Sequence, residues 1–508
     1  MSHISASSQD DVLKDQSNRL RDQSNQLRDQ YDISDRYGFL TDPAKIPQEL
    51  PPGFEEYKPI VDVIDNPDGN YFRNLVNKLK QGKPQEYYIA LANSLSDAQK
   101  LQIYTIFTFI AQKYVRCMGA IKPIPLNLQL YDLICWLFNA PVSQREKQIQ
   151  EIPYEIGLIW NECSKPFKLP CVTAYSAVIL NNFRLKPGCV IGTETLNLDD
   201  IIPVYAISDT YAELHFYKLH MAIEALGHKI IKSMYFIGDQ IKSKENMIAL
   251  LKEIRTTVRQ IHIVLIRMYS KCRPEVFWKC VRIYLGGYTK DNGLPDGLKV
   301  TGTNISFKFG GGSAAQSTLI QAIDIFFNID QAKHGETFLK NQRDYMPFKH
   351  RQFLKDLAQI HSGDLIRNTV ISYNDQEVTD EYNKAVDALK EFRRSHYNLV
   401  HNYIDKFVDK SKANVNAMAE LEKNNVHGSK GSGGLPTEKL KDFIDETEDT
   451  KIGEQYVTQK QWRQFYKFLR VAQWWLWRIS TISLFVGCML FYYFVNETMH
   501  NSFWSNSF

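Results

Sequence analysis

The sequence lacks the cysteine patterns that mark two common kinds of site. Its eight cysteines are spread irregularly over 508 residues, and none of them forms a C-x-x-C pair. A disulfide scaffold needs many cysteines in a short chain, and a structural zinc site needs closely spaced ligands. We therefore predict reduced thiols in a cytosolic protein, and no zinc site.

An excess of charge of one sign is also missing. The chain has 61 basic and 57 acidic residues, a net charge of +4. This balance leaves no broad basic face, so we predict no nucleic-acid partner. The polar start MSHISASSQDD lacks the apolar stretch of a secretory signal. With 44% apolar and 23% charged residues, the composition is that of a folded globular protein with room for two or three domains.

Residues 1–35 form a polar extension. Asp15–Arg21 (DQSNRLR) is followed by Asp22–Arg28 (DQSNQLR), a seven-residue repeat with one leucine in each copy. A coiled coil needs two apolar positions in each heptad and three or more heptads. We therefore predict a solvated, disordered extension, and a partner-binding helix is the alternative.

The rest of the chain has mostly helical spacing. Apolar residues recur at helical intervals in the second half, and strand alternation is nearly absent there. The sequence predicts a mainly α protein, with a small, mostly helical N-terminal domain (36–200) and a large all-α domain (201–445). The helical segments predicted in the large domain are Thr210–Phe236, Ser243–Ser270, Ala314–Phe327, Asp380–Val408 and Thr437–Ile444.

Two stretches of the small domain have strongly apolar faces. Tyr104–Phe109 and Leu126–Leu137 are predicted to be buried faces of helices. Leu169–Leu180 (LPCVTAYSAVIL) fits either a strand or a helix, because a short apolar run has no distinguishing period.

A charged linker (446–470) precedes a C-terminal tail (471–508). Ile479–Val495 contains 17 uncharged residues, which is at the short end of what crosses a bilayer. Basic residues and tryptophans precede this segment, and tyrosines lie at its far end. This pattern predicts a transmembrane helix that anchors the protein at the cytosolic face of a membrane. A buried core helix is the alternative.

A candidate metal ligand lies in Asp344–Leu354 (DYMPFKHRQFL). Pro347 suits the first turn of a helix, which puts His350 early in that helix. Phe353 follows three residues later on the same face. A histidine beside apolar neighbours can present a ring nitrogen to a haem iron. The alternative is a core or surface histidine with ordinary hydrogen bonds.

A candidate anion-binding residue lies in Glu275–Tyr288 (EVFWKCVRIYLGGY). This segment is largely apolar but contains Arg282, and a guanidinium in such surroundings needs a counter-charge. The counter-charge is either a substrate carboxylate, held in bidentate geometry, or a carboxylate of the chain itself.

Phe309–Gln316 (FGGGSAAQ) is a glycine-rich loop that leads into a helix. Such a loop allows a flat or anionic ligand to approach the backbone. It lacks the lysine of a phosphate-binding loop, so it is not a Walker motif. The alternative is a plain turn in which Ser313 is the N-cap of the helix.

Several segments together resemble the indoleamine 2,3-dioxygenase family, and they occur in that family's order. DISDRYGFL (Asp32–Leu40) is similar to the start of its small domain. The likeness runs from about Asp32 to Ile444. The segments that carry it are EVFWKCVRIYLGGY, GGGSAAQ with Asp324 downstream, DYMPFKHRQFL, SHYNLVHNYI (Ser395–Ile404) and KGSGG (Lys430–Gly434).

The resemblance implies a cofactor and the residues around it. His350 matches the family's proximal ligand of a haem iron, so one haem b per chain is expected. Ser313 and Ala314 match small residues beside the haem and the substrate. Phe353 and Asp324 are expected to contribute to the same cofactor site.

The resemblance also implies substrate contacts. Arg282 matches the arginine that binds the carboxylate of tryptophan, and Phe277 matches a phenylalanine packed against the indole. Tyr175 and Ile179 match residues that line the indole pocket. Gly431–Gly434 matches a mobile loop over the site, in which Ser432 and Gly433 are expected to contact the substrate.

One helix departs from the mammalian pattern. In Glu213–Gly227 (ELHFYKLHMAIEALG), Phe216 matches a phenylalanine of the distal pocket. His220 stands where mammalian members have a serine. The two residues are four apart, so both can face the haem. Tryptophan dioxygenases, the sister family, have a distal histidine that contacts the indole N–H. The alternative is that His220 points elsewhere.

The activity implied by the resemblance is that of a haem dioxygenase. It inserts O2 across the indole C2–C3 bond of L-tryptophan and gives N-formylkynurenine, the first step of the kynurenine pathway and of NAD synthesis. A reductant would keep the haem ferrous, and a monomer is expected. The alternatives are an oxygen-binding haem protein on the same scaffold and a signalling protein that recruits partners. Arg282 and Phe277 favour the enzyme, because an oxygen carrier needs no clamp for a carboxylate.

Overall fold

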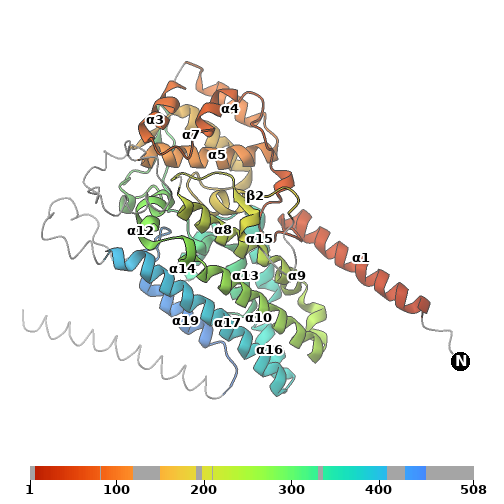
Figure 1. Ribbon diagram of the computed structural model, residues 1–508. Helices are drawn as coiled ribbons and strands as arrows, with labels where there is room; N and C mark the ends of the chain where they lie inside the picture. The colour runs from red at the N-terminus through yellow and green to blue at the C-terminus, as the bar shows by residue number, and fades with distance from the viewer. Residues whose placement is uncertain are drawn as a thin grey trace, which may run out of the picture. The chain divides into compact units, whose positions relative to one another are not determined.

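The structure, a computed structural model, describes residues 6–79, 82–117, 149–189, 197–208, 210–329, 336–408 and 430–453. These residues are mainly helical, with a few short strands, as predicted (Figure 1). Residues 1–450 form one compact unit, and residues 451–508 form another. The predicted boundary at residue 200 lies within the first unit and stays a prediction.

The helices of the first unit fall into two runs along the chain. The first run is α1 (Ala6–Tyr31), α2 (Lys58–Val61), α3 (Gly69–Lys78), α4 (Gln85–Asn93), α5 (Asp97–Arg116) and α7 (Tyr154–Ser164). The second run is α8 (Tyr211–Leu226), α9 (His228–Tyr235), α10 (Lys244–Ile266), α11 (Met268–Lys271), α12 (Pro274–Val276), α13 (Thr318–Phe326), α14 (Glu336–Arg343), α15 (Phe348–Ile360), α16 (Leu365–Ser372), α17 (Gln376–Val400) and α19 (Leu440–Glu448).

Short strands join distant parts of the chain. In one sheet β4 (Leu298–Val300) lies between β1 (Glu151–Ile152), to which it is parallel, and β5 (Ser306–Phe307), to which it is antiparallel. In the other sheet β2 (Phe183–Leu185) pairs with β3 (Ile201–Pro203) in antiparallel register. The first sheet ties the segment before α7 to the loop region that precedes the glycine-rich segment.

Helix α5 is the buried centre of the first run. Ser96 and Gln99 form a capping box at its start, in which each side chain accepts a hydrogen bond from the other residue's backbone N–H. The helix packs on α7, which packs in turn on α4. Trp160 of α7 donates its indole N–H to Thr108 at 3.0 Å. The prediction of a buried helix face at Tyr104–Phe109 is confirmed, whereas Leu126–Leu137 lies outside the described residues.

Helices α10 and α17 are the longest pair of the second run, and they lie side by side (Figure 1). Arg255 forms an ion pair with Glu381 at 2.5 Å, and the His262 ring is 2.8 Å from the Ser395 hydroxyl. The second contact lies after the first along both α10 and α17, so the two helices are parallel. Helix α8 packs on α10, and α19 packs on α17.

Some long segments predicted as single helices are interrupted. Gly227 separates α8 from α9, and a Cβ at this position would lie 2.6 Å from Leu319. Close packing on α13 thus requires a glycine there. The chain also forms π-helical turns at η5 (Ser176–Leu180), η8 (Phe277–Val281) and η12 (His401–Asp405). The ambiguous segment Leu169–Leu180 therefore ends in a π-helix and not in a strand. Such turns often occur at functional sites.

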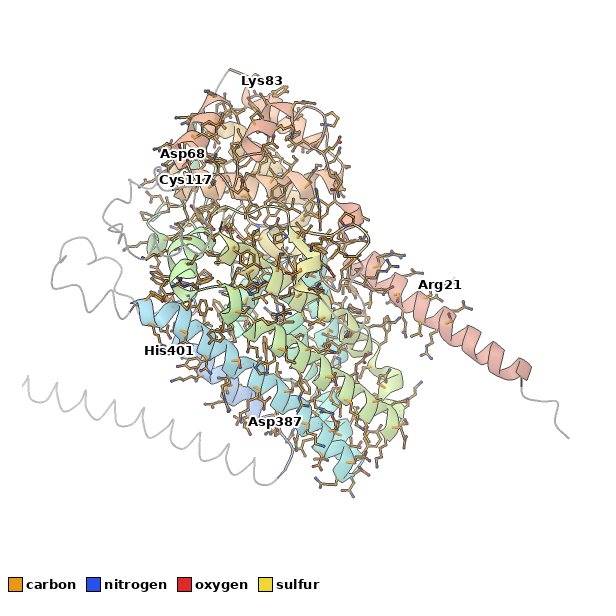
Figure 2. The ribbon with its side chains drawn as sticks, viewed as in Figure 1. Arg21, Asp68, Lys83, Cys117, Asp387 and His401 are labelled. Carbon is orange, nitrogen blue, oxygen red and sulfur yellow. The ribbon has the colours of Figure 1, made fainter. Side chains whose placement is uncertain are left out.

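The N-terminal extension, which the sequence predicts to be disordered, forms α1 in the structure. Arg21 lies on its exposed part (Figure 2), whereas Leu27 and Tyr31 are buried against α9 and α15. Lys232 of α9 donates hydrogen bonds to the Leu20 carbonyl and the Ser24 hydroxyl. The helix is therefore held by contacts of its last turns, which a search for heptads does not detect.

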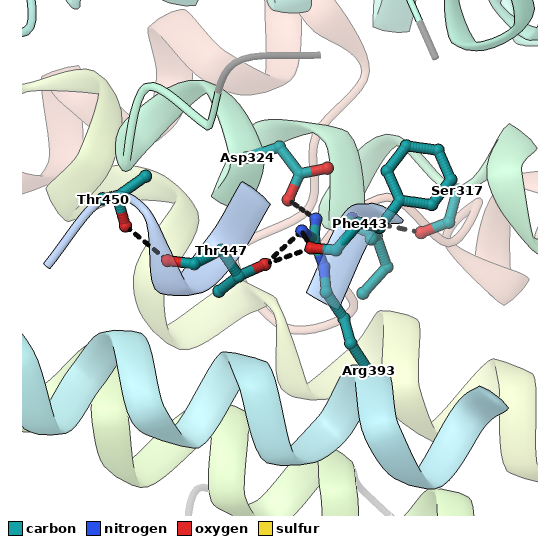
Figure 3. A network of polar contacts seen from close by, with 7 residues as sticks. Ser317, Asp324, Arg393, Phe443, Thr447 and Thr450 are labelled. Atoms are coloured by element: carbon teal, nitrogen blue, oxygen red, sulfur yellow. Dashed lines mark hydrogen bonds and ion pairs between the residues drawn. The ribbon is translucent and has the colours of Figure 1, made fainter. Parts of the chain in front are cut away.

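The C-terminal end of the first unit is fixed by a buried ion pair. Arg393 of α17 pairs with Asp324 of α13 and donates to the Phe443 carbonyl and the Thr447 hydroxyl of α19 (Figure 3). Helix α19 continues to Glu448, so regular structure extends beyond residue 445, where the sequence places the start of the linker.

The prediction of a transmembrane helix falls on Ile479–Val495, which lies outside the described residues. Among the described residues, no helix combines the length and the apolar composition needed to span a bilayer.

Candidate active site

His350 is a buried histidine whose ring nitrogens have no hydrogen-bond partner among the described residues. It lies in the first turn of α15, directly after the N-cap Pro347, and is 4% exposed. Its Nδ1 atom is fully buried, and no described residue is a hydrogen-bond partner for it. Burial, and then the charge of Lys349, lowers the pKa of His350 to about 3, so the ring is neutral at neutral pH. A neutral ring with a free lone pair is what a metal ion requires of histidine.

Aromatic rings surround His350. The Phe39 ring meets it edge-on at 5.0 Å between centroids, and Phe353 lies 5.4 Å from Phe39. Phe353 is completely buried and also contacts Tyr31 and Tyr235. We name His350, Phe39 and Phe353 the His350 cluster. These ring contacts account for the burial of Phe353, and its contact with a cofactor stays a prediction.

A second cluster gathers residues from α8, η5 and η8. The Phe216 ring is 4.4 Å from that of His220 and 5.3 Å from that of Phe277. The Tyr175 ring lies 6.0 Å from His220. We name Phe216, His220, Phe277 and Tyr175 the His220 cluster. The structure therefore brings together four residues that the sequence assigns to the substrate and the distal pocket.

His220 has a defined tautomer. Its Nδ1 atom lies 2.9 Å from the Phe216 carbonyl oxygen, and a carbonyl only accepts, so Nδ1 carries the proton. Burial lowers the pKa of His220, which favours the neutral ring. Nε2 then has a free lone pair and can only accept a hydrogen bond. Both Phe216 and His220 are partly exposed.

Glu224 continues the face of α8 that carries Phe216 and His220. One of its carboxyl oxygens accepts hydrogen bonds from Tyr175 at 3.0 Å and from Ser317 at 2.5 Å. The other oxygen is buried and has no partner in the described part of the chain. Burial raises the pKa of Glu224 to about 7, against the two hydrogen bonds that lower it. The carboxyl group therefore links α8 to Tyr175 and to Ser317, the N-cap of α13.

Arg282 follows η8 directly. One of its guanidinium nitrogens donates to the Lys430 carbonyl at 2.6 Å, and the group lies 5.2 Å from the centre of the Trp278 ring. No ion pair joins it to a carboxylate in the described part of the chain. Burial lowers the pKa of Arg282 to about 10, and the charge of Asp405 opposes this shift. The guanidinium therefore stays charged at neutral pH and has donors left for an anion.

Two glycine-containing loops lie against each other beside Arg282. The backbone N–H of Gly311 donates to the Ser432 carbonyl at 3.1 Å, and the Ser432 hydroxyl donates to the Gly312 carbonyl. A Cβ at Gly311 would lie 2.0 Å from the Leu285 carbonyl, and one at Gly433 would lie 2.7 Å from Ser313. Side chains at these two positions would thus separate the loops.

The other predicted site residues have the following surroundings. Ser313 caps the short helix η11 (Ala314–Gln316) by accepting from the Ala315 N–H, and Ala314 is exposed. Ile179 is buried in η5. Asp324 is engaged by Arg393, so its carboxylate already has a cationic partner.

Sequence reasoning did not single out Phe39 and Tyr403, which contact residues of the two clusters, or Arg343. Phe39 and Tyr403 both lie in segments that carry the family resemblance, and the Tyr403 ring is 5.6 Å from that of Phe277. Arg343, at the end of α14, donates its Nε to Gln321 at 2.8 Å and has no other partner among the described residues. Their positions relative to the site depend on tertiary packing, which no local pattern reports.

Comparison with known proteins agrees with this geometry. A family model described as "Indoleamine 2,3-dioxygenase" matches residues 27–450. Indoleamine 2,3-dioxygenase 2 of Homo sapiens is 27% identical over 381 residues, which is 74% of this chain and 83% of the human protein. Indoleamine 2,3-dioxygenase of Saccharomyces cerevisiae is 26% identical over 395 residues, covering 74% and 79%.

A further relative carries a different substrate in its name. 6-hydroxytryptophan 2,3-dioxygenase of Fusarium equiseti is 28% identical over 326 residues, which is 61% of this chain and 78% of that protein. The matched family region includes both clusters, Arg282 and the two glycine-containing loops. The chain therefore belongs to the indoleamine 2,3-dioxygenase family.

Proposed function

We propose that the protein is a haem-dependent dioxygenase that inserts O2 across the indole C2–C3 bond of L-tryptophan and releases N-formylkynurenine. The proposal rests on three neighbouring features: the Arg282 guanidinium, the contact between the Phe277 and Phe216 rings, and the acceptor nitrogen of His220. A partly buried, cationic guanidinium at Arg282 directly follows η8, whose Phe277 ring contacts the Phe216 ring. Beside them, His220 offers a hydrogen-bond acceptor.

The residues present fit a haem with one protein ligand. His350 is neutral, buried and without hydrogen bonds among the described residues, so coordination would satisfy a ring nitrogen that otherwise has no partner. We infer one haem b per chain, held by His350. Arg343 is a candidate partner for a haem carboxylate, because its terminal nitrogens are unpaired in the described residues. When bound, the haem supplies the activation of O2, for which a reductant keeps the iron ferrous.

The protein's part in the reaction is to bind and orient the substrate. Arg282 would hold the carboxylate through the donors that Lys430 leaves free. Phe277 and Phe216 would pack on the faces of the indole, with Tyr175 and Ile179 behind it. The loop with Ser432 and Gly433 would cover the substrate and exclude water.

His220 is proposed to accept a hydrogen bond from the indole N–H. The carbonyl of Phe216 fixes the ring proton on Nδ1, which leaves the Nε2 lone pair for the substrate. A neutral histidine can fill this role without protonating the indole. The serine of the mammalian members is shorter, so His220 would reach the substrate where a serine side chain does not.

The test is turnover by the full chain loaded with haem and kept ferrous, followed by the absorbance of N-formylkynurenine. We expect turnover of L-tryptophan, and in Arg282→Ala a rise in KM of about a thousandfold, because a buried charged partner is lost. Arg282→Lys keeps the charge without the fork geometry and is the matched control; it should lose less affinity. Haem binding without turnover would favour the oxygen-binding alternative over the enzyme.

The same assay decides the substrate. 6-hydroxytryptophan differs from tryptophan by one hydroxyl on the benzene ring of the indole, so the two compete for the same contacts. We propose tryptophan because the rings that surround the site, Phe216 and Phe277, are apolar. A larger kcat/KM for 6-hydroxytryptophan would contradict this assignment.

We also propose that residues 471–508 anchor the protein to a membrane. The support is the apolar run at Ile479–Val495 with its basic and aromatic flanks. We expect the full chain to sediment with membranes and to resist extraction by carbonate, and a chain ending at Tyr456 to remain in the supernatant. Equal distribution of the two chains would contradict the proposal.

A further inference from the structure

Asp405 is a partly buried carboxylate that the proposed reaction does not yet use. It is the last residue of η12, directly after the end of α17, where Figure 2 labels His401. One of its carboxyl oxygens lies 3.3 Å from the His401 ring nitrogen Nδ1. The other, Oδ1, is buried and has no hydrogen-bond partner among the residues that the structure describes. A buried carboxylate oxygen without a partner is costly, so a ligand that satisfies it is expected.

The position of η12 places Asp405 beside the substrate residues. Helix η12 packs against α12 and η8, the turn that carries Phe277. Tyr403, two residues before Asp405, contacts Phe277 ring to ring at 5.6 Å. The charge of Asp405 also acts on Arg282, although no ion pair joins the two among the described residues. The carboxylate and the guanidinium are therefore near each other but not bonded.

A separated pair of opposite charges matches the chemistry of an α-amino acid. Such a substrate carries a carboxylate and an ammonium on neighbouring atoms, and each needs a partner of the opposite sign when it leaves water. Arg282 supplies the partner for the carboxylate. We propose that Asp405 binds the α-ammonium group of the substrate through Oδ1, which makes the site selective for zwitterionic indoles. This inference rests on the proposed function.

A simpler role for Asp405 would be to balance the charge of Arg282. The two roles differ in what they predict for a ligand that lacks the ammonium. If Asp405 only balances Arg282, its neutralisation strengthens the binding of every carboxylate to the same extent. If Asp405 binds the ammonium, its neutralisation weakens the binding of L-tryptophan. Indole-3-propionate, which has no ammonium, should then bind at least as tightly as it does to the wild type.

The experiment measures equilibrium binding to the full-length holoenzyme by the change in haem absorbance. L-tryptophan and indole-3-propionate are titrated into the wild type, Asp405→Asn and the control Asp380→Asn, which changes an exposed carboxylate near the start of α17. We expect the wild type and the control to prefer L-tryptophan by about tenfold or more, the value of one charged hydrogen bond. In Asp405→Asn the preference should fall close to one.

Each outcome bears on the inference. An unchanged preference in Asp405→Asn, or an equal change for both ligands, would overturn it and leave the proposed function standing. A wild-type holoenzyme that responds to neither ligand would overturn both proposals. If Asp405→Asn does not load haem, Asp405→Glu is measured instead. It keeps the charge but moves the oxygens by one methylene, and it too should lose most of the preference.

Discussion

The histidines of the two clusters are alike in a lowered pKa and opposite in hydrogen bonding. Both rings are held neutral by desolvation. His220 has Nδ1 tied to a backbone carbonyl, whereas His350 has neither nitrogen tied to any described residue. A neutral imidazole ring with one hydrogen-bonded nitrogen is held in one orientation and presents a single acceptor. A buried ring without hydrogen bonds has unsatisfied nitrogens until a ligand binds. This difference supports the proposals that His350 binds the haem iron and that His220 contacts the substrate.

The clusters also differ in their supporting residues. The His220 cluster is supported by hydrogen bonds that Tyr175 and Ser317 donate to Glu224. The His350 cluster is supported by the rings of Tyr31 and Tyr235, and the Tyr31 hydroxyl is hydrogen-bonded to Asp356 and to Tyr235. The first support contains a titratable group that responds to pH, and the second is held mainly by packing.

The largest expected effect concerns the His350 cluster and haem binding. His350→Ala should abolish haem binding, because it removes the proposed ligand of the iron. The measurement is the haem content of the purified full chain, from its absorbance in pyridine and alkali. His361→Gln is the matched control, since His361 is also buried but already bonds to the Met234 carbonyl. Equal loss in both variants would show that burial, and not coordination, explains the result.

The next effect concerns pH and the other cluster. The pKa of Glu224 is raised from 4.5 to about 7 by burial, so between these values the folded protein holds a proton that the unfolded chain has released. The free energy of unfolding therefore falls as pH rises through this window. A shift of this size corresponds to roughly 2.5 kcal/mol between pH 5 and pH 8.

Glu224→Gln removes the titration but keeps an acceptor for Tyr175 and Ser317. Its stability relative to the wild type should therefore rise from pH 5 to pH 8 by that amount. Urea unfolding of the two proteins at both values gives the comparison, with the exposed Glu391→Gln as control. A difference between Glu224→Gln and the wild type that does not change with pH would contradict the raised pKa of Glu224.

A smaller effect is expected at His220 itself. His220→Phe keeps an aromatic ring of similar size and removes the acceptor. It should lower kcat/KM for L-tryptophan by about tenfold, the value of a neutral hydrogen bond. 1-Methyltryptophan, which has no indole N–H, should show no such loss. Equal loss for both substrates would mean that His220 only fills space, and the contrast between the two histidines would weaken.

The sequence predicts much of this site because its motifs are local. Pro347 and His350 share one turn of helix, and Phe216 and His220 are one turn apart, so spacing alone places each pair. The mainly α fold follows in the same way from helical periodicity.

Tertiary contacts cannot be predicted from local spacing in this way. The carbonyl that fixes His220, the Asp405 carboxylate near Arg282, and the contact of Phe39 with His350 join distant segments or depend on rotamers. Helix α1 depends on such contacts as well: its repeat is a poor heptad, and the burial of Leu27 and Tyr31 against α9 and α15 holds its last turns.

The smallest expected effect tests whether packing alone supports the His350 cluster. Tyr31 is completely buried, and its hydroxyl donates to the Asp356 carboxylate at 2.6 Å. Tyr31→Phe keeps the ring contacts with Phe353 and removes that bond, so it should cost roughly 1.5 kcal/mol of unfolding free energy. Because Asp356 lies on the helix that carries His350, haem should also transfer faster to apomyoglobin. Tyr211→Phe, at an exposed tyrosine, is the control and should change stability by less than about 0.5 kcal/mol. If Tyr31→Phe behaves like this control, the cluster is held by its rings alone, and α1 stabilises it only through the area that it buries.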